Sequence, residues 1–257
     1  MTERLSKKLR QERILYRLGS DVTVRILSLA EQFGVTTETI RRDIDELTDK
    51  GLVSRTYGGA ASKSLTTEPN IHQRRRTNVI ERERIANYAA SLIEPGEVLM
   101  IDSGSTTSHF AKALAARMIQ LTVLTNCLPI VQVFGGIPDV RVIMCPGDYR
   151  DTENCVFGQQ TTDFLGRFQA NKSIIGAGGI TSIDITDADA EAGWIKRKMI
   201  ERSEQTLLLL DHGKFGKRLF DNVCSLSAVN DLITDKEPPA DIGRALKSAS
   251  VNLHIVK

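Results

Sequence analysis

Between residues 98 and 256 the chain repeats one pattern, in which a short apolar run is followed by a stretch with the apolar spacing of a helix. The apolar runs are three to six residues long, and they lie at 98–101, 121–125, 140–144, 172–177, 206–210, 232–234 and 251–256. Runs that are apolar on both faces and alternate with helices predict a mostly parallel α/β sheet. Because such sheets bind ligands beyond the carboxyl ends of their strands, we expect a binding site in the loops after these runs.

The first third of the chain differs from the rest in charge. Residues 1–76 contain 15 Lys and Arg against 10 Asp and Glu, whereas residues 77–257 contain 19 against 22. The net charge of +2 therefore averages a basic first part with a mildly acidic remainder. This asymmetry predicts two parts with different partners, and nucleic acid is a candidate partner of the first.

The basic part is predicted to contain a helix-turn-helix. Leu9, Ile14 and Leu18 have helical spacing, and residues 26–33 form a second helical stretch that Gly34 ends. Thr36 lies at the N-cap position of a third helix, whose buried stripe is predicted to be Ile40, Ile44 and Leu47. Two helices joined by a tight glycine-containing turn form this motif. Residues 52–60 are expected to follow as a short β-hairpin wing.

The third helix has the residue types that DNA recognition needs. If its apolar stripe faces inward, its first turns present an outer face to base edges and phosphates. An arginine there can bind guanine through two hydrogen bonds or contact a phosphate. The expected DNA contacts are Thr36, Thr37, Glu38, Thr39, Arg41 and Arg42 on the helix, with Arg55 and Tyr57 in the wing. For the two helix arginines taken alone, the alternative is a solvated helix face.

The order of these residues resembles the winged-helix signature of the DeoR family of transcriptional regulators. The resemblance lies in Arg10, Ile14 and Leu18, in the run 36–44 and in the run 57–60 at the end of the wing. It implies a DNA-binding domain over residues 1–62, a linker over 63–82 and an effector-binding and oligomerisation domain over 83–257. Asp43 has two interpretations: it orients an arginine or caps locally, or it contacts DNA.

The linker is predicted to be an exposed connector that leads into a helix starting at about Glu83. It is rich in Ser and Thr, contains Pro69 and carries the run 74–76 of three arginines. We expect this basic run to be a solvated helix start or an interdomain contact, and contact with the DNA backbone is the alternative.

The loop after the first apolar run contains Asp102, Ser103, Gly104, Ser105, Thr106 and Thr107 and opens a helix. Glycine lets the backbone approach an anion, amide groups at a helix N-terminus point toward it, and hydroxyls add donors. The loop is therefore a candidate phosphate site, and the alternative is a helix start with surplus capping groups. It has no Walker lysine, so nucleoside triphosphate hydrolysis is not implied.

The loops after four other runs bring polar and basic residues to the same edge. Asn126 follows the second run, Arg150 the third, Gly178 and Gly179 the fourth, and Lys214 the fifth. An anion site with Asn and Asp for hydroxyls and with Lys and Arg for charge suits a small phosphorylated sugar or polyol.

These residues also resemble the effector domain of DeoR-family regulators, which is similar in fold to ribose-5-phosphate isomerase and the CoA-transferase-like group. By this resemblance residues 104–107 take the phosphate, and Asp102, Asn126, Gly179 and Lys214 surround the sugar. The chain departs from the family at Asn171, where Asp is frequent, and at Pro146, where Gly is commoner. Both departures bear on the choice of effector.

The isomerase-like fold raises the alternative of a sugar-phosphate isomerase with an accessory DNA-binding domain. Proton abstraction next to a carbonyl needs a base, and Asp184, Asp187, Asp189 and Glu191 follow the glycine-rich turn. Acids at such a place are more often loop and helix N-terminal residues. Since the domain is fused to a DNA reader, we predict a non-enzymatic transcriptional repressor of a sugar or polyol catabolic operon. By family resemblance, the phosphosugar usually releases such a repressor from DNA.

No cofactor or metal is expected, because His72, His109, His212 and His254 lack metal-ligand spacing. The four cysteines have no C-x-x-C spacing and are predicted to be free thiols in a reducing cytoplasm. No run of 18 apolar residues or secretory signal is found. The expected partners are operator DNA, a phosphorylated effector and further copies of the chain as a dimer or tetramer, because one winged helix contacts too little DNA.

Overall fold

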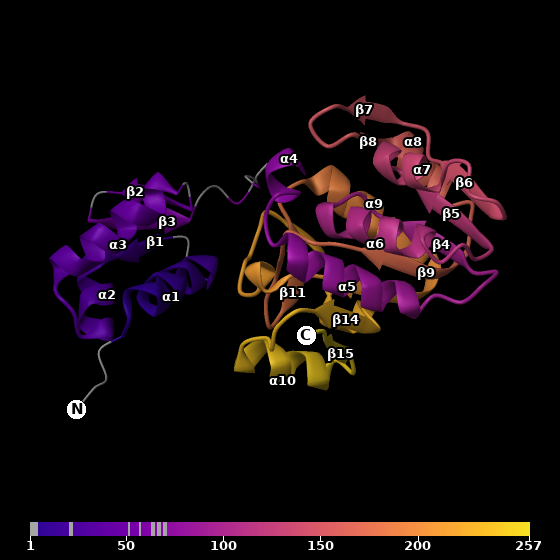
Figure 1. The fold of residues 1–257 in the computed structure, drawn as a ribbon. Helices are drawn as coiled ribbons and strands as arrows, with labels where there is room; N and C mark the ends of the chain where they lie inside the picture. The colour runs from indigo at the N-terminus through magenta and orange to yellow at the C-terminus, as the bar shows by residue number, and fades with distance from the viewer. Residues whose placement is uncertain are drawn as a thin grey trace.

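The computed structural model describes residues 5–20, 23–50, 52–56, 58–62, 65, 68 and 71–257, so that Tyr57, an expected DNA contact, lies outside the described residues. The first part of the chain, drawn in indigo and violet in Figure 1, forms a winged helix-turn-helix domain. Its helices are α1 (Lys7–Ser20), α2 (Ile26–Phe33) and α3 (Thr37–Asp49), and its strands are β1 (Thr23–Arg25), β2 (Val53–Thr56) and β3 (Gly59–Ser62).

The helix-turn-helix forms where the sequence predicts it. Gly34 ends α2 in the left-handed conformation with φ 62°, and the side chain of Thr36 caps α3 by accepting a hydrogen bond from the Thr39 amide at 3.2 Å. The predicted stripe of α3 is fully buried in one core with α1, α2 and the wing. Of the three apolar residues with helical spacing in α1, Ile14 and Leu18 are buried, whereas Leu9 is 40% exposed. The buried face of α1 follows the spacing of residues 10, 14 and 18, and Leu9 lies beside it.

The sequence gives no signal for β1, because three residues are too few to show an alternating pattern. This strand pairs antiparallel with β3, which gives the sheet order β1-β3-β2. Gly59 permits the pairing, since a Cβ at this position would lie 2.0 Å from the carbonyl oxygen of Val24. The wing is therefore fastened to the domain by a third strand.

The second part of the chain is a three-layer α/β domain built on a seven-stranded sheet. All seven predicted runs become its strands, in the order β15-β14-β12-β9-β4-β5-β6, and every neighbouring pair is parallel. The strands are β4 (Val98–Ile101), β5 (Leu121–Thr125), β6 (Val140–Met144), β9 (Ala170–Ile175), β12 (Ser203–Leu209), β14 (Asp231–Thr234) and β15 (Asn252–Ile255). The helices are α4 (Ile71–Arg74), α5 (Val79–Ser91), α6 (Ser105–Ala115), α7 (Leu128–Phe134), α8 (Gln159–Leu165), α9 (Ala190–Glu201) and α10 (Ala240–Ser248). The predicted α/β class with a mostly parallel sheet is confirmed.

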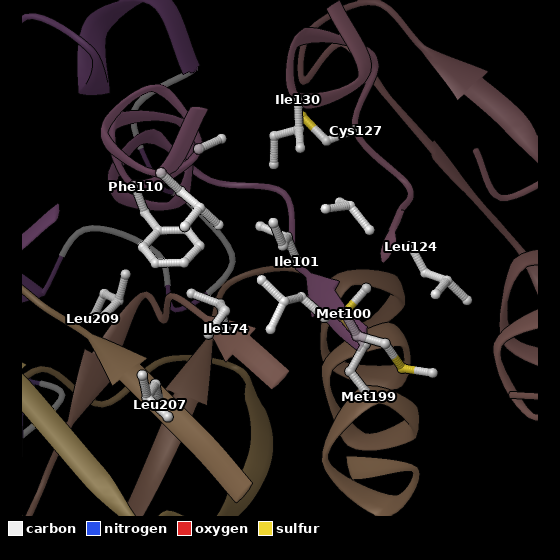
Figure 2. Packing of buried hydrophobic residues seen from close by; sticks show 14 of the residues in the cluster. Met100, Ile101, Phe110, Leu124, Cys127, Ile130, Ile174, Met199, Leu207 and Leu209 are labelled. Carbon is white, nitrogen blue, oxygen red and sulfur yellow. The ribbon is translucent and has the colours of Figure 1, made fainter. Parts of the chain in front are cut away.

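Helices cover both faces of the sheet. Figure 2 shows Phe110 of α6 directed toward Ile174 and Leu209 on one side, and Met199 of α9 beside Met100 on the other. Strands β4, β5 and β6 succeed one another in one direction, whereas β9, β12, β14 and β15 succeed one another in the opposite direction. The strand order therefore reverses between β4 and β9, and the carboxyl ends of strands at such a switch point flank a crevice where α/β proteins bind ligands.

Several short elements were not predicted. The strands β7 (Asp148–Arg150) and β8 (Cys155–Phe157) form a hairpin beyond β6, and β10 (Gly179–Ile180), β11 (Asp184–Asp187) and β13 (Asp221–Ser225) form a small antiparallel sheet. Two short 3-10 turns, η1 (His212–Lys214) and η2 (Leu226–Ala228), complete the chain path. The strands β7, β11 and β13 contain polar residues, and β8 and β10 are only three and two residues long, so none of the five shows the apolar run that revealed the main sheet.

The segment predicted as an exposed connector is buried in part. Ile71 of α4 and Arg82 of α5 are both buried, and α5 begins at Val79 rather than at about Glu83. The side chain of Arg82 can be buried because Asp211 neutralises its charge at 2.9 Å. None of the helices in the described part of the chain is long and apolar enough to cross a membrane.

Candidate nucleic-acid interface and effector pocket

The first turns of α3 present a polar face to the solvent. Thr36, Glu38, Arg41 and Arg42 are exposed there, and Thr37 and Thr39 are half-buried. Glu38 lies between the two arginines, at 3.5 Å from Arg41 and 3.6 Å from Arg42. Since exposed ion pairs of this kind contribute only about 0–1 kcal/mol, both guanidinium groups can exchange Glu38 for DNA at little cost.

Asp43 points away from this face. Its carboxylate accepts two hydrogen bonds from Arg10 of α1, one from Nε at 2.5 Å and one from Nη2 at 3.0 Å. Both side chains are buried, so of the two interpretations of Asp43 the geometry matches the one in which it orients an arginine. The neighbouring Asp45 is more exposed and pairs with Arg55 of the wing.

A charged pocket lies at the switch point of the main sheet. Its lining consists of the loop after β4 (103–106), the turn after β9 (176–177), the end of β12 (209–210) and the side chains of Glu68, Arg74, Asp187, Lys196 and Lys214. This cavity has a volume of about 30 Å³. A second cavity of about 170 Å³ shares Glu68, Arg74, Ser103, Asp187 and Lys196 with it and extends toward Arg150.

The loop after β4 is held by its own hydroxyls. Thr107 Oγ1 donates to the carbonyl of Asp102 at 2.7 Å, and Ser105 Oγ accepts from Arg82 at 3.0 Å. Ser103, Gly104 and Thr106 line the pocket together with Ser105, whereas the fully buried Thr107 does not. The amide groups at the start of α6 thus lie at the pocket, and Thr107 supports the loop from behind.

A buried ion cluster forms the floor of the pocket. Lys196 Nζ of α9 lies 3.0 Å from Asp102 and 3.2 Å from Asp187, with all three side chains buried. Burial alone would lower the pKa of Lys196, but the two carboxylates outweigh it, so this pKa lies above its usual value and the ammonium stays charged. Burial raises the pKa of Asp102, which Lys196 opposes. Asp102, predicted to bind the sugar directly, is thus engaged by Lys196.

Sequence reasoning missed Lys196, and one signal could have found it. In α9 the buried residues Ala192, Ile195 and Met199 follow one helical stripe, and Lys196 lies within that stripe. A lysine on the inner face of a helix implies buried acidic partners. Glu68 and Arg74 were missed as well, because their segment was predicted to be an exposed connector.

The other predicted effector residues lie around the pocket at different depths. Lys214 lines the smaller cavity, and Arg150 lines the larger one while it pairs with Asp189 and Glu191. Asn126 is fully buried and donates to the Val156 carbonyl at 3.0 Å; its Oδ1 has no hydrogen-bond partner in the described part of the chain. It does not line either cavity.

Gly178 and Gly179 do not line the cavities either. A Cβ at Gly178 would lie 2.3 Å from Leu219, and one at Gly179 would lie 2.1 Å from the carbonyl oxygen of Lys217. Glycine is needed at Gly179, where the neighbour is backbone, whereas the neighbour of Gly178 is the end of the Leu219 side chain, which can move. In this glycine-rich turn the residue that lines the pocket is Gly176, whose amide donates to Asp102 Oδ2 at 3.3 Å.

Two family descriptions match the chain. The DeoR-like helix-turn-helix domain matches residues 10–66, and the DeoR C terminal sensor domain matches residues 77–236. The chain belongs to the DeoR family. The regulator therefore combines a DNA-binding domain with a sensor domain, and the pocket described above lies in the sensor part.

Related proteins cover nearly all of this DeoR-family chain. It is 34% identical to the glycerol-3-phosphate regulon repressor of Escherichia coli (strain K12) over 228 residues, 88% of this chain and 90% of that one. It is 32% identical to an uncharacterized HTH-type transcriptional regulator of Bacillus subtilis (strain 168) over 250 residues, 96% of each. It is 30% identical to the lactose phosphotransferase system repressor of Staphylococcus epidermidis over 217 residues, 83% of this chain and 86% of that one.

A solved structure of ribose 5-phosphate isomerase A from Methanocaldococcus jannaschii is similar over 54% of this chain and 55% of that one, with 12% identity and a TM-score of 0.41. A TM-score of this size does not establish a shared fold or a shared activity.

The family assignment makes the chain a DNA-binding regulator of transcription rather than an enzyme. The acids considered as a catalytic base have other partners. Asp187 pairs with Lys196, Asp189 caps α9 by accepting from the Glu191 amide at 2.9 Å, and Asp184 accepts from Thr181 at 2.7 Å.

The thiols and the possible metal ligands complete the description of the site. All four cysteines are free, and Cys127, Cys145 and Cys155 are buried. Burial raises the pKa of Cys145 to about 12, so this thiol stays protonated. Within the described residues, no group of three or more His, Cys, Asp or Glu side chains is placed to hold a metal ion.

Proposed function

We propose that this regulator represses a sugar or polyol catabolic operon and that a phosphorylated sugar or polyol controls its binding to operator DNA. The observation that carries the proposal is the pocket at the switch point, where the start of α6 faces Lys196 and Lys214. Helix N-terminal amides and lysine ammonium groups are what a phosphate needs. The names of the relatives for the glycerol-3-phosphate regulon and the lactose phosphotransferase system support this class of effector.

Within the pocket we propose a division of roles among the predicted effector residues. Ser103, Gly104 and Thr106 contact the phosphate together with Lys214, because these four line the smaller cavity. Asp102, Ser105 and Thr107 hold the loop through the contacts described above. Arg150 faces the unphosphorylated end of the effector from the larger cavity. Asn126, Gly178 and Gly179 support the surrounding chain.

For DNA binding we propose that the exposed start of α3 enters the major groove. Thr36, Thr37, Glu38, Thr39, Arg41 and Arg42 lie on this face, and Arg55 extends it into the wing. One such domain buries too little surface for high specificity, so a dimer or tetramer on repeated half-sites is part of the proposal. A regulator of this kind with free thiols acts in the cytoplasm.

Two measurements test the proposal. A thermal-shift screen compares sugar phosphates and polyol phosphates with their unphosphorylated counterparts, and a phosphorylated compound is expected to raise the melting temperature because it binds only the folded state. The same compound is expected to change the affinity for the operator upstream of the regulated genes, measured by fluorescence anisotropy. If no phosphorylated compound binds at millimolar concentration, the effector proposal is wrong.

The recognition helix is tested with Arg41→Ala. Loss of a base contact is expected to weaken operator binding by about 1–3 kcal/mol and to relax specificity at one position. Arg13→Ala is the matched control, since it removes the same charge from an exposed position of α1 in the same domain. Operator binding that is equal in the Arg41→Ala variant and the wild type would remove Arg41 from the interface.

A further inference from the structure

The pocket already contains an anion that belongs to the chain itself. Glu68 lies between the two domains in sequence, three residues before α4, and its carboxylate accepts a hydrogen bond from Lys214 Nζ and lies 3.4 Å from Arg74 Nη1. The side chains of Glu68, Lys214 and Arg74 are only 17%, 14% and 15% exposed. Glu68 therefore holds the two cations of the pocket that lie nearest to the connector.

Glu68 also limits the space in the pocket. It lines both the cavity of about 30 Å³ over the α6 loop and the adjoining cavity of about 170 Å³. The smaller volume has room for no more than a water molecule or two, whereas small-molecule sites have volumes of about 300–1,000 Å³. Glu68 therefore takes up part of the space beside the loop that a phosphorylated sugar would need.

The chemistry of the Glu68 site suits a phosphate at least as well as a carboxylate. Burial raises the pKa of Glu68, but Lys214 and Arg74 outweigh this effect, so the pKa lies below its usual value and the group is an anion. Arg74 also pairs with Glu153, yet its Nε is buried without a hydrogen-bond partner within the described residues. A phosphate has more acceptor oxygens than a carboxylate and can use such a donor.

We propose that the Glu68 carboxylate occupies the position of the effector phosphate, and that the effector binds by displacing Glu68 from Lys214 and Arg74. This inference rests on the proposed function, and it adds Arg74 to the phosphate-binding residues and names the event by which binding is transmitted. The displaced residue belongs to the segment that joins the sensor domain to the DNA-binding domain.

The displacement removes one of the contacts that hold the connector to the sensor domain. A second contact lies closer to the DNA-binding domain, where the Leu65 carbonyl accepts a hydrogen bond from the Phe220 amide at 3.1 Å. Leu65 and Glu68 lie three and six residues after Ser62, the last residue of β3. Release of Glu68 therefore loosens a segment that is attached to the sensor domain and leads directly into the DNA-binding domain.

The test is the affinity of the full chain for inorganic phosphate, measured by isothermal titration calorimetry in the wild type and in Glu68→Gln. Removing the internal competitor is expected to tighten phosphate binding by about tenfold or more, the range that corresponds to a charge-assisted hydrogen bond. Glu68→Ala is the second variant, and it is expected to bind at least as tightly because it also clears the space. In a Lys214→Gln background the gain from Glu68→Gln is expected to disappear.

Glu97→Gln is the matched control. The side chain of Glu97 is 16% exposed and pairs with Lys172, which is 12% exposed, beside the amino-terminal end of β4 and far along the strand from the pocket. The Glu97→Gln variant loses the same charge from a similarly buried ion pair, and its phosphate affinity is expected to equal that of the wild type.

The outcomes separate this inference from the proposed function. If a phosphorylated compound binds the wild type and shifts operator affinity, but Glu68→Gln and Glu68→Ala bind phosphate no more tightly than the wild type, the displacement is overturned and the proposed function stands. If neither the wild type nor the variants bind any phosphorylated compound, the displacement and the proposed function are both wrong. Equal tightening in Glu97→Gln would show a general charge effect and would also overturn the displacement.

Discussion

Replacing Asp43 by alanine is expected to destabilise the DNA-binding domain strongly while the stability of the sensor domain stays the same. The side chains of Arg10 and Asp43 are 11% and 2% exposed, and they share two hydrogen bonds. Removing one partner of a buried ion pair leaves the other charge uncompensated, which costs about 3–5 kcal/mol of folding free energy. A domain of about 60 residues has a stability of about 3–9 kcal/mol, so this loss removes a third of it or more.

The assay combines thermal unfolding with operator binding. The single tryptophan, Trp194, lies in α9 of the sensor domain, so its fluorescence reports on that domain, whereas circular dichroism reports on the helices of both domains. Asp43→Ala is expected to give an early circular dichroism transition, an unchanged tryptophan transition and operator binding that is lost over the temperature range of the early transition. Asp45→Ala, which breaks an exposed ion pair two residues away in α3, is expected to change stability by about 1 kcal/mol or less.

A double variant distinguishes a structural role from a DNA contact. Arg10→Met combined with Asp43→Leu replaces the pair with apolar side chains of similar size and is expected to restore the fold and much of the operator affinity. The reasoning is refuted if Asp43→Ala unfolds like the wild type and only binds the operator more weakly. Asp43 would then act on DNA directly.

Two further predictions concern the sensor domain. Thr106→Ala is expected to weaken phosphate binding without changing the melting temperature. Thr107→Ala is expected to lower both the phosphate affinity and the melting temperature, because the Thr107 hydroxyl holds the loop by donating to Asp102. Calorimetry of the two variants measures both quantities, and unchanged phosphate affinity in Thr106→Ala would contradict the loop assignment. The second concerns Asp211, whose pKa burial raises but Arg82 and Asn78 lower more strongly, so that it lies below the usual value. Its ion pair therefore stabilises the fold above about pH 4 and loses this effect as the pH falls through the lowered pKa. In urea unfolding at pH 7, Asp211→Asn is expected to have a lower free energy of unfolding than the wild type, and this difference is expected to narrow as the pH falls below 4. A difference that stays constant with pH would show that the charge of Asp211 does not cause it.

The main sheet could be predicted from the sequence because its strands are buried on both faces. Runs such as Val98–Ile101 contain only apolar residues, so their burial and their ends are visible without the structure. The helix-turn-helix was equally visible, since the left-handed turn at Gly34 and the cap at Thr36 each require particular residue types.

The charged floor of the pocket was not visible in this way. Lys196 contacts Asp102 and Asp187 only when β4, β11 and α9 are packed together in the folded domain. No local sequence pattern predicts contacts between residues so far apart in the chain. Glu68 was hidden for a related reason. A polar residue in a Ser- and Thr-rich segment has the composition of a solvated linker, and only the positions of Arg74 and Lys214 show that it points into the protein.

The pairing of β4 with β9 has a consequence for the order of events during synthesis. Leu99 is in register with Lys172, so 73 residues must follow Leu99 out of the ribosome before the central strand pair can close. At about 5–20 residues per second this takes about 4–15 s. The winged-helix domain has all of its strand partners within residues 23–62 and is complete long before then. A nascent chain therefore completes its winged-helix domain seconds before its sensor domain, and premature termination between these points would release a folded winged-helix domain without a sensor.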